Sequence, residues 1–367
     1  MAVFLAVNAS ACTPAPRLGP ERQDPGWPYY LGNPHHDISA LESLPAEPQH
    51  VWVAHTGRAV RGAPAIGPNI VAVTTTDRFI MLLDRADGKV IWQTHLGGTM
   101  NAGPLLRGDR LFAATEAAPD ARAYAIRLST GKAIWTVDVK GGVAAPLALD
   151  GGEILLGTEP GTVWALDAET GAVHWRNRLN GAVRAQPLVT AKGVLVFTTD
   201  DSMYLLRRDN GEILRRGPTP GTVLGTPALD NETAYLATTA GQVIALDVAT
   251  LTARWMVPAG DVVYGPPALA RDTLYVLPRN GILLVIPVTT PEAARRDSLL
   301  LAATAGPTPL AHGVLVAGVD GTLLLALPDR GSVAWRIHLP GPIEAPPLVR
   351  DGALFVVGGQ GDVHLYR

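Results

Sequence analysis

The sequence predicts an all-β fold, an eight-bladed β-propeller of four-stranded antiparallel blades, because two kinds of residue recur with a period near 40. The first is a proline followed by alanine or leucine, at steps of 38 to 42 residues: Pro64-Ala65, Pro104-Leu105, Pro146-Leu147, Pro187-Leu188, Pro227-Ala228, Pro267-Ala268, Pro309-Leu310 and Pro347-Leu348. The second is tryptophan, in phase with the first: Trp52, Trp92, Trp135, Trp175, Trp255 and Trp335. Eight repeats of this length predict eight blades.

The third repeat shows the four strands of a blade most clearly. Short apolar segments over 145–149, 153–158, 162–167 and 172–179 are separated by turns rich in glycine. Glycine and proline punctuate strands in this way because they supply the backbone angles that tight turns need. The proline at the start of the first strand needs no hydrogen-bond partner there. The nearest segment to a helix, residues 291–301, is short and lies in the most degenerate repeat.

The ring is expected to close through the N-terminal strand. After Pro347 the chain supplies only three strands, which end at Arg367. The missing fourth strand has its tryptophan at Trp52, within residues 50–55. Pairing this strand with the last one removes two exposed sheet edges, which otherwise promote aggregation.

Composition supports one large folded domain, predicted over residues 27–367 with a lead-in over 27–47. Of the 367 residues, 47% are hydrophobic, which excludes disorder for most of the chain. Only 17% are charged and the net charge is -3, with no basic stripe. These values argue against nucleic acid as a partner.

The N-terminus predicts a signal peptide and a lipid anchor. Residues 1–11 form a short apolar run that ends in small residues, as a secretory signal does. The sequence from Ala9 to Cys12 resembles a bacterial lipobox, in which Cys12, the only cysteine, is lipidated. Residues 12–26 are rich in proline and predict an extended tether. Thr13 rather than aspartate follows the cysteine, which indicates the outer membrane, with the domain facing the periplasm. The alternative is an ordinary N-terminus with a chance cysteine.

The segment from the third to the fourth strand carries a family resemblance. Residues 161–175, with Asp167, Thr170, Gly171 and Trp175, resemble the pyrroloquinoline-quinone-type (PQQ-like) propeller repeat. Other repeats match it in full or in part, and the resemblance covers residues 27–367. It implies that aspartate and threonine close a turn and that the tryptophans fill the space between blades. Such rings occur in quinoprotein dehydrogenases and in non-enzymatic scaffolds, of which the BamB-type outer-membrane assembly lipoproteins resemble this chain in length, lipobox-like start and ending.

No enzymatic site is expected. The resemblance implies that a dehydrogenase would hold Ca²⁺ with Glu, Asn and Asp, use a catalytic Asp and commonly carry a disulfide between adjacent cysteines, in a longer chain. This chain has one cysteine and no such insertions, so we predict no catalytic residue, no cofactor and no metal site. His55, His95 and His338 share one repeat position, but neighbouring packed sheets lie about 10 Å apart. They are therefore expected to be exposed polar residues rather than ligands of one ion.

The predicted function is a cell-envelope scaffold that binds protein partners, including the β-barrel assembly machinery if the role is BamB-like. The alternatives are an envelope sensor with another partner and a quinoprotein dehydrogenase. Arg207, Arg208, Arg215 and Arg216 form a predicted partner patch, since arginine is enriched at interfaces. Their alternative role is to pair with nearby carboxylates. The Leu-x-Leu-Arg and Asp-rich contact loops of BamB-type proteins correspond here to residues 222–225 and 261–264, where the contact motif is not reproduced.

Overall fold

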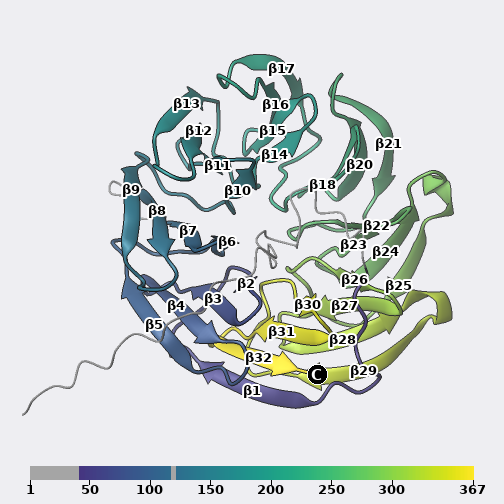
Figure 1. Ribbon diagram of the computed structural model, residues 1–367. Coiled ribbons are helices and arrows are strands. Elements are labelled where there is room, and N and C mark those ends of the chain that lie inside the picture. Colours follow the sequence, from purple (N-terminus) through teal and green to yellow (C-terminus); the bar gives the residue numbers. More distant parts are fainter. Residues whose placement is uncertain (1–40, 117–120) are drawn as a thin grey trace, which may run out of the picture.

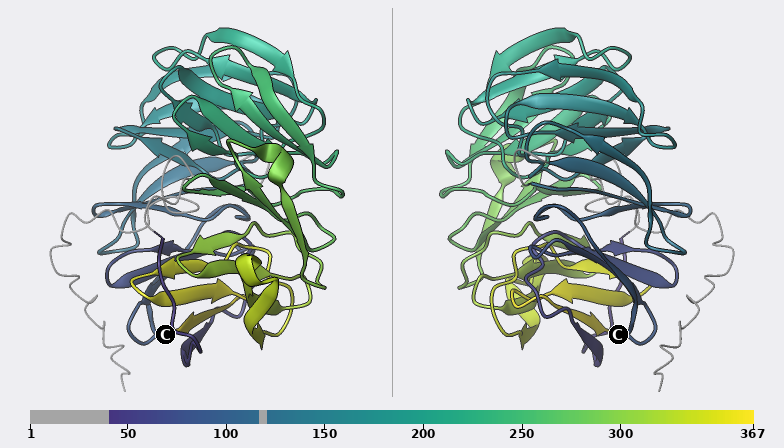
Figure 2. Two further views of the ribbon diagram at one scale, coloured as in Figure 1. Left: turned by 90° about the vertical axis from the view of Figure 1, so that its right-hand side faces the viewer. Right: turned by 90° about the vertical axis from the view of Figure 1, so that its left-hand side faces the viewer.

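The computed structural model describes residues 41–116 and 121–367 and shows eight four-stranded antiparallel sheets arranged as the blades of a ring (Figure 1). The innermost strand of each blade is the shortest. The outermost strands form the circumference, and the side views show the blades stacked around the ring (Figure 2). The predicted all-β, eight-bladed propeller is therefore confirmed.

The strands follow each other from the axis outwards in seven of the blades. Blade 1 contains β2 (Ala65–Ile66), β3 (Ile70–Thr74), β4 (Phe79–Asp84) and β5 (Val90–His95), and blade 2 contains β6 (Leu105–Arg107), β7 (Arg110–Ala114), β8 (Arg122–Arg127) and β9 (Ala133–Asp138). Blade 3 contains β10 (Ala148–Asp150), β11 (Glu153–Gly157), β12 (Thr162–Asp167) and β13 (Val173–Arg178), and blade 4 contains β14 (Leu188–Thr190), β15 (Gly193–Thr198), β16 (Ser202–Leu206) and β17 (Ile213–Pro218).

The second half of the ring repeats this order. Blade 5 contains β18 (Ala228–Asp230), β19 (Thr233–Ala237), β20 (Gln242–Asp247) and β21 (Thr252–Pro258), and blade 6 contains β22 (Ala268–Ala270), β23 (Thr273–Val276), β24 (Ile282–Pro287), the 3-10 helix η1 (Pro291–Ala293) and β25 (Arg295–Ser298). Blade 7 contains β26 (Thr308–Leu310), β27 (Gly313–Ala317), β28 (Thr322–Leu327), the 3-10 helix η2 (Pro328–Arg330) and β29 (Ser332–His338), and blade 8 contains β30 (Leu348–Arg350), β31 (Ala353–Val357), β32 (Asp362–Tyr366) and β1 (His50–His55).

Blade 8 is closed by the N-terminal strand, as the sequence predicts. β1 pairs antiparallel with β32, with His55 opposite Asp362 and Val53 opposite His364 (Figure 1). Beyond the strands, Gln49 and Arg367 exchange two backbone hydrogen bonds of 2.5 and 2.9 Å. The described end of the lead-in also contacts the ring, because the Glu42 carbonyl oxygen accepts a hydrogen bond from the amide of Ala311 in blade 7.

Each gap between neighbouring blades holds its own apolar cluster, so that eight clusters form the core. Side chains alternate between the two faces of a strand, and one blade therefore contributes to two clusters. Just before the innermost strands, glycines let neighbouring backbones touch. A Cβ on Gly62 would lie 2.2 Å from the Gly103 nitrogen, and one on Gly225 would lie 2.4 Å from the Gly265 carbonyl carbon.

Strand limits in the third repeat differ from the expectation at the inner strand. That strand begins at Ala148 rather than at residue 145, so Pro146 precedes it instead of lying inside it. Residues 291–301 contain the short 3-10 helix η1 and strand β25. The predicted segments 1–11 and 12–26, with Cys12, lie outside the described residues. Within the described ranges, no helix is long and apolar enough to cross a membrane.

Candidate functional site

The six tryptophans that recur with the repeat period lie on the outermost strands and connect neighbouring blades. In five of the six, the indole Nε1–H donates to a backbone carbonyl in the turn between the third and fourth strands of the next blade, at 2.6 to 3.1 Å. The pairs are Trp52–Arg85, Trp92–Leu128, Trp135–Ala168, Trp175–Arg208 and Trp255–Val288. These tryptophans, called the tryptophan ladder below, therefore join neighbouring blades by hydrogen bonds as well as by apolar contact.

Trp335 is the exception, and the closure of the ring explains it. Its buried Nε1 has no hydrogen-bond partner among the residues that the structure describes. In blade 8 the third and fourth strands are β32 and β1, which come from opposite ends of the described chain. No turn joins them, and the carbonyl that accepts the indole proton elsewhere has no counterpart there.

In blade 3, the turn that meets the Trp135 indole is held by its own aspartate and threonine, as the family resemblance implies. The Asp167 carboxylate accepts hydrogen bonds from the amides of Glu169 and Thr170 and from the Thr170 hydroxyl, at 2.7 to 3.0 Å. These bonds, foremost that from the hydroxyl, lower the pKa of Asp167. The turn ends at Gly171, whose φ of +74° and bare Cα allow it to lie against the Trp135 ring; a Cβ there would be 2.8 Å from the indole.

The four arginines of the predicted patch do not share one role. Three of them face a carboxylate: Arg207 pairs with Glu212 at 3.2 Å, Arg208 pairs with Asp150 of blade 3, and Arg216 lies 3.6 Å from Asp200. Arg216 also lies over the Tyr204 ring, 5.3 Å from its centroid. Three arginines thus take part in local ion pairs, which was the alternative role that the sequence left open.

Arg215 is different, since it replaces a tryptophan of the ladder. Its side chain is exposed, and among the described residues it has neither an ion pair nor a hydrogen bond. Arg215 lies opposite Leu205, whereas Arg216 lies opposite Tyr204. Because Leu205 belongs to the cluster between blades 4 and 5 and Tyr204 to that between blades 3 and 4, the two arginines point to opposite faces of blade 4.

The two mid-chain loops that correspond to family contact loops are neighbours in space. Residues 222–225 precede β18, and residues 261–264 precede β22, at the same end of adjacent blades. Gly225 and Gly265 touch, as noted above. The Thr222 hydroxyl donates to Asp201 at 2.7 Å, and Tyr264 is 38% exposed. These loops therefore form one surface at the end of blade 4 that carries Asp201, whereas Arg207 and Arg208 lie in the turn at the opposite end of β16.

The three histidines at the shared repeat position do not converge. His55 lies 2.9 Å from the Asp362 carboxylate, His95 packs edge-on against Phe79 and His338 lies opposite Thr322. Within the described ranges, no group of three or more His, Cys, Asp or Glu side chains is arranged to hold a metal ion. The residues before the innermost strands are small or apolar: Ala63, Gly103, Ala145, Thr226 and Pro266.

The sequence shows both Arg215 in place of a repeat tryptophan and Leu251 in place of the turn glycine of the next blade, but the link between the two changes was not drawn from the sequence. The turn of blade 5 that would meet this indole ends in Leu251 instead of glycine, at φ +58°, and Leu251 is 7% exposed. A leucine fits there because no ring covers the turn. The sequence indicates this link, because Arg215 and Leu251 are separated by the same number of residues as Trp175 and Gly211 of the preceding interface.

Comparison with known proteins points to the same family along most of the chain. The family model described as "Outer membrane protein assembly factor BamB" matches residues 37–127, 119–291 and 291–367. No curated protein sequence matches the chain. Among solved structures, BamB from Moraxella catarrhalis superposes with a TM-score of 0.74 at 18% identity, covering 88% of this chain and 100% of that one.

Two further structures share the fold. A quinohemoprotein alcohol dehydrogenase from Comamonas testosteroni has a TM-score of 0.78 at 14% identity and covers 95% of this chain and 81% of its own. The computationally designed Ika8 protein has a TM-score of 0.74 at 15% identity and covers 87% of this chain and 99% of its own. At these identities the superpositions show the propeller fold alone. The match of the family model over residues 37–367 shows that this chain belongs to the BamB family of PQQ-like β-propellers.

Proposed function

We propose that this protein is a non-enzymatic scaffold of the bacterial cell envelope that binds protein partners, with a BamB-like role in the assembly of outer-membrane β-barrel proteins. The observation that carries the proposal is the family match over residues 37–367. The Moraxella BamB chain is covered in full by the matched region, whereas the Comamonas dehydrogenase has about a fifth of its chain outside it. A propeller without large additions suits a rigid binding platform.

The proposed docking surface is the turn of blade 4 that carries Arg207 and Arg208. Arginine at a protein interface donates several hydrogen bonds to carboxylates and packs its flat group on partner side chains. The test is purification of the tagged protein from crosslinked envelopes, followed by mass spectrometry. A component of the barrel assembly machinery should be enriched, and a variant with Arg207→Glu and Arg208→Glu should lose it. Equal recovery with the tag alone would refute the scaffold function.

Lipid anchoring through Cys12 is part of the proposal. Lipidation would hold the propeller at the outer membrane, and the proline-rich residues 12–26 would separate it from the lipid surface. Wild-type protein should fractionate with outer membranes, and a Cys12→Ser variant should move to the soluble fraction. If the two proteins fractionate alike, the anchor is excluded.

The absence of quinone chemistry is also a proposal. It is supported by the lack of convergent carboxylates among the described residues and by the close backbone contacts near the axis. Quinone sites are enclosed and carry a few placed polar groups. Titration with pyrroloquinoline quinone and Ca²⁺, followed by a dye-linked alcohol dehydrogenase assay, should show neither saturable binding nor turnover. Saturable binding together with turnover would restore the enzyme interpretation.

A further inference from the structure

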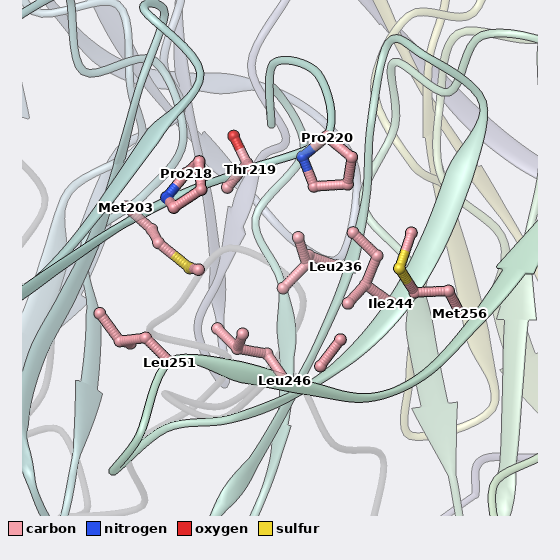
Figure 3. A pocket seen from close by; sticks show the side chains of 10 residues that line it. Met203, Pro218, Thr219, Pro220, Leu236, Ile244, Leu246, Leu251 and Met256 are labelled. Carbon is pink, nitrogen blue, oxygen red and sulfur yellow. The ribbon is translucent and has the colours of Figure 1, made fainter.

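The gap between blades 4 and 5 contains an apolar cavity of about 400 Å³ that opens to solvent (Figure 3). Its floor is made by Met203 of β16, Leu236 of β19 and Ile244 of β20, which are 5%, 1% and 3% exposed. Pro220 and Met256 lie near its mouth, and Met256 is 49% exposed. This volume lies within the usual range of ligand sites, about 300–1,000 Å³.

The preceding gap, between blades 3 and 4, shows why the cavity exists. That gap is filled by Trp175 and Asn177 from blade 3, and by Tyr204 and Arg216 from blade 4. In the gap between blades 4 and 5, the equivalent positions lie forty residues later and do not fill the space. They hold Arg215, Gly217, Ile244 and Met256. Arg215 is exposed, and Gly217 presents only a hydrogen toward the Met203 methyl group, where a Cβ would lie 3.0 Å from Cε.

Four changes therefore leave this gap unfilled, and Leu251 is one of the residues that line it. A void in a protein interior lowers stability, because its lining atoms lose contacts. Here the void is open and apolar, and Arg215 is on the face of β17 that is turned toward the same gap, which is the arrangement of a binding pocket. Two of its lining side chains are methionines, which are flexible and adapt to different partners.

We propose that this cavity is a docking pocket for an extended segment of a partner protein, which inserts one aromatic or large aliphatic side chain and places a carboxylate against Arg215. The inference rests on the proposed scaffold function and adds the location and chemistry of one contact. Charge complementarity carries the choice of partner. Arg207, Arg208 and Arg216 already face carboxylates, whereas Arg215, on the face of blade 4 that is turned toward the pocket, has no such partner among the described residues. Buried aromatic anchors with a charged neighbour dominate binding energy at interfaces.

The five methionines of the chain allow a direct test with ¹³C-methyl labelling. Met203 and Met256 line the pocket, whereas Met81 and Met100 are buried in other gaps between blades and serve as internal references. The probe is a capped hexapeptide with one phenylalanine flanked by two aspartates. It should shift the Met203 and Met256 signals saturably and leave the references unchanged. A peptide with alanine for phenylalanine should not bind, and one with lysine for aspartate should bind more weakly.

Two variants restore the filled gap by copying the residues of the preceding one. Ile244→Tyr places a ring in the pocket, and the double variant Ile244→Tyr with Met256→Arg adds the guanidinium that covers this ring in the preceding gap. Both should abolish the shift of Met203. Arg215→Ala should weaken binding of the aspartate peptide by about two- to fivefold, as exposed ion pairs do, and should remove the preference over the lysine peptide.

Several results would overturn the inference. One is an absence of shifts at millimolar peptide, and another is equal binding of the alanine peptide. Undiminished binding to the Ile244→Tyr protein, with unchanged reference signals, would place the peptide elsewhere. A shift with dodecylphosphocholine below its micellar concentration, but not with the peptide, would assign the pocket to lipid chains. If crosslinked envelopes yield partner proteins while the peptide does not bind, the docking-pocket inference is refuted and the scaffold function is supported. If the peptide binds but no envelope partner is found, the scaffold function is refuted and the pocket is supported.

Discussion

Replacement of Trp175 tests whether the ladder stabilises the ring. The indole is 6% exposed, packs against Gly211 of the next blade and donates a 2.8 Å hydrogen bond to the Arg208 carbonyl oxygen. Truncation of buried aromatic side chains to alanine costs about 3–5 kcal/mol. We therefore expect Trp175→Ala to lower the free energy of unfolding by about 3–5 kcal/mol. The measurement is urea denaturation followed by far-ultraviolet circular dichroism, with linear extrapolation.

A matched pair of phenylalanine variants isolates the hydrogen bond from the packing. Trp175→Phe keeps a ring but loses the donor, whereas Trp335→Phe removes a donor that has no acceptor. A typical hydrogen bond contributes about 0.5–1.5 kcal/mol net. Trp175→Phe should therefore be the more destabilising of the two by about 1 kcal/mol. A loss below about 1 kcal/mol for the alanine variant, or an equal loss for the two phenylalanine variants, would refute this account.

Three further predictions concern closure, acid stability and turn geometry. Deletion of residues 48–56 should cause aggregation or a large fall in melting temperature, because it leaves the outer edge of β32 without a partner strand, while deletion of residues 13–24 should change little. Equal melting temperatures of the two deletion variants would contradict the closure. Burial lowers the pKa of His364, so its folded pKa lies below the unfolded value near 6.5 and stability should fall as pH drops through that value. The urea midpoint of a His364→Leu variant should therefore change less between pH 7 and pH 5 than that of the wild type. An equal change in the two proteins would show that His364 does not cause the loss of stability in acid. Gly211→Ala should destabilise more than Gly331→Ala in thermal melts, since both have positive φ but only the first meets a tryptophan ring within 4 Å; equal losses would mean that backbone strain alone decides.

Repetition made the architecture predictable from the chain alone. Each blade repeats the same short strands and glycine turns, so an error in one repeat is corrected by the others. Counting strands after Pro347 also predicted that β1 completes blade 8, because an unpaired strand edge is unfavourable. The predicted inner strand of blade 3 began too early, at residue 145 instead of Ala148. A proline is tolerated both at the start of a strand and in the loop before it, so Pro146 did not fix where the strand begins.

The contacts between blades could be decided only in three dimensions. The arginines near position 210 are neighbours in sequence, yet alternation along β17 sends Arg215 and Arg216 to opposite faces. Of these four arginines, Arg215 alone has no carboxylate partner within the described part of the chain. The pocket depends on side chains from two blades that lie forty residues apart, and each substitution by itself is unremarkable for a propeller. A period in the sequence reports what every blade shares, whereas a binding site arises where neighbouring blades fail to fill the space between them.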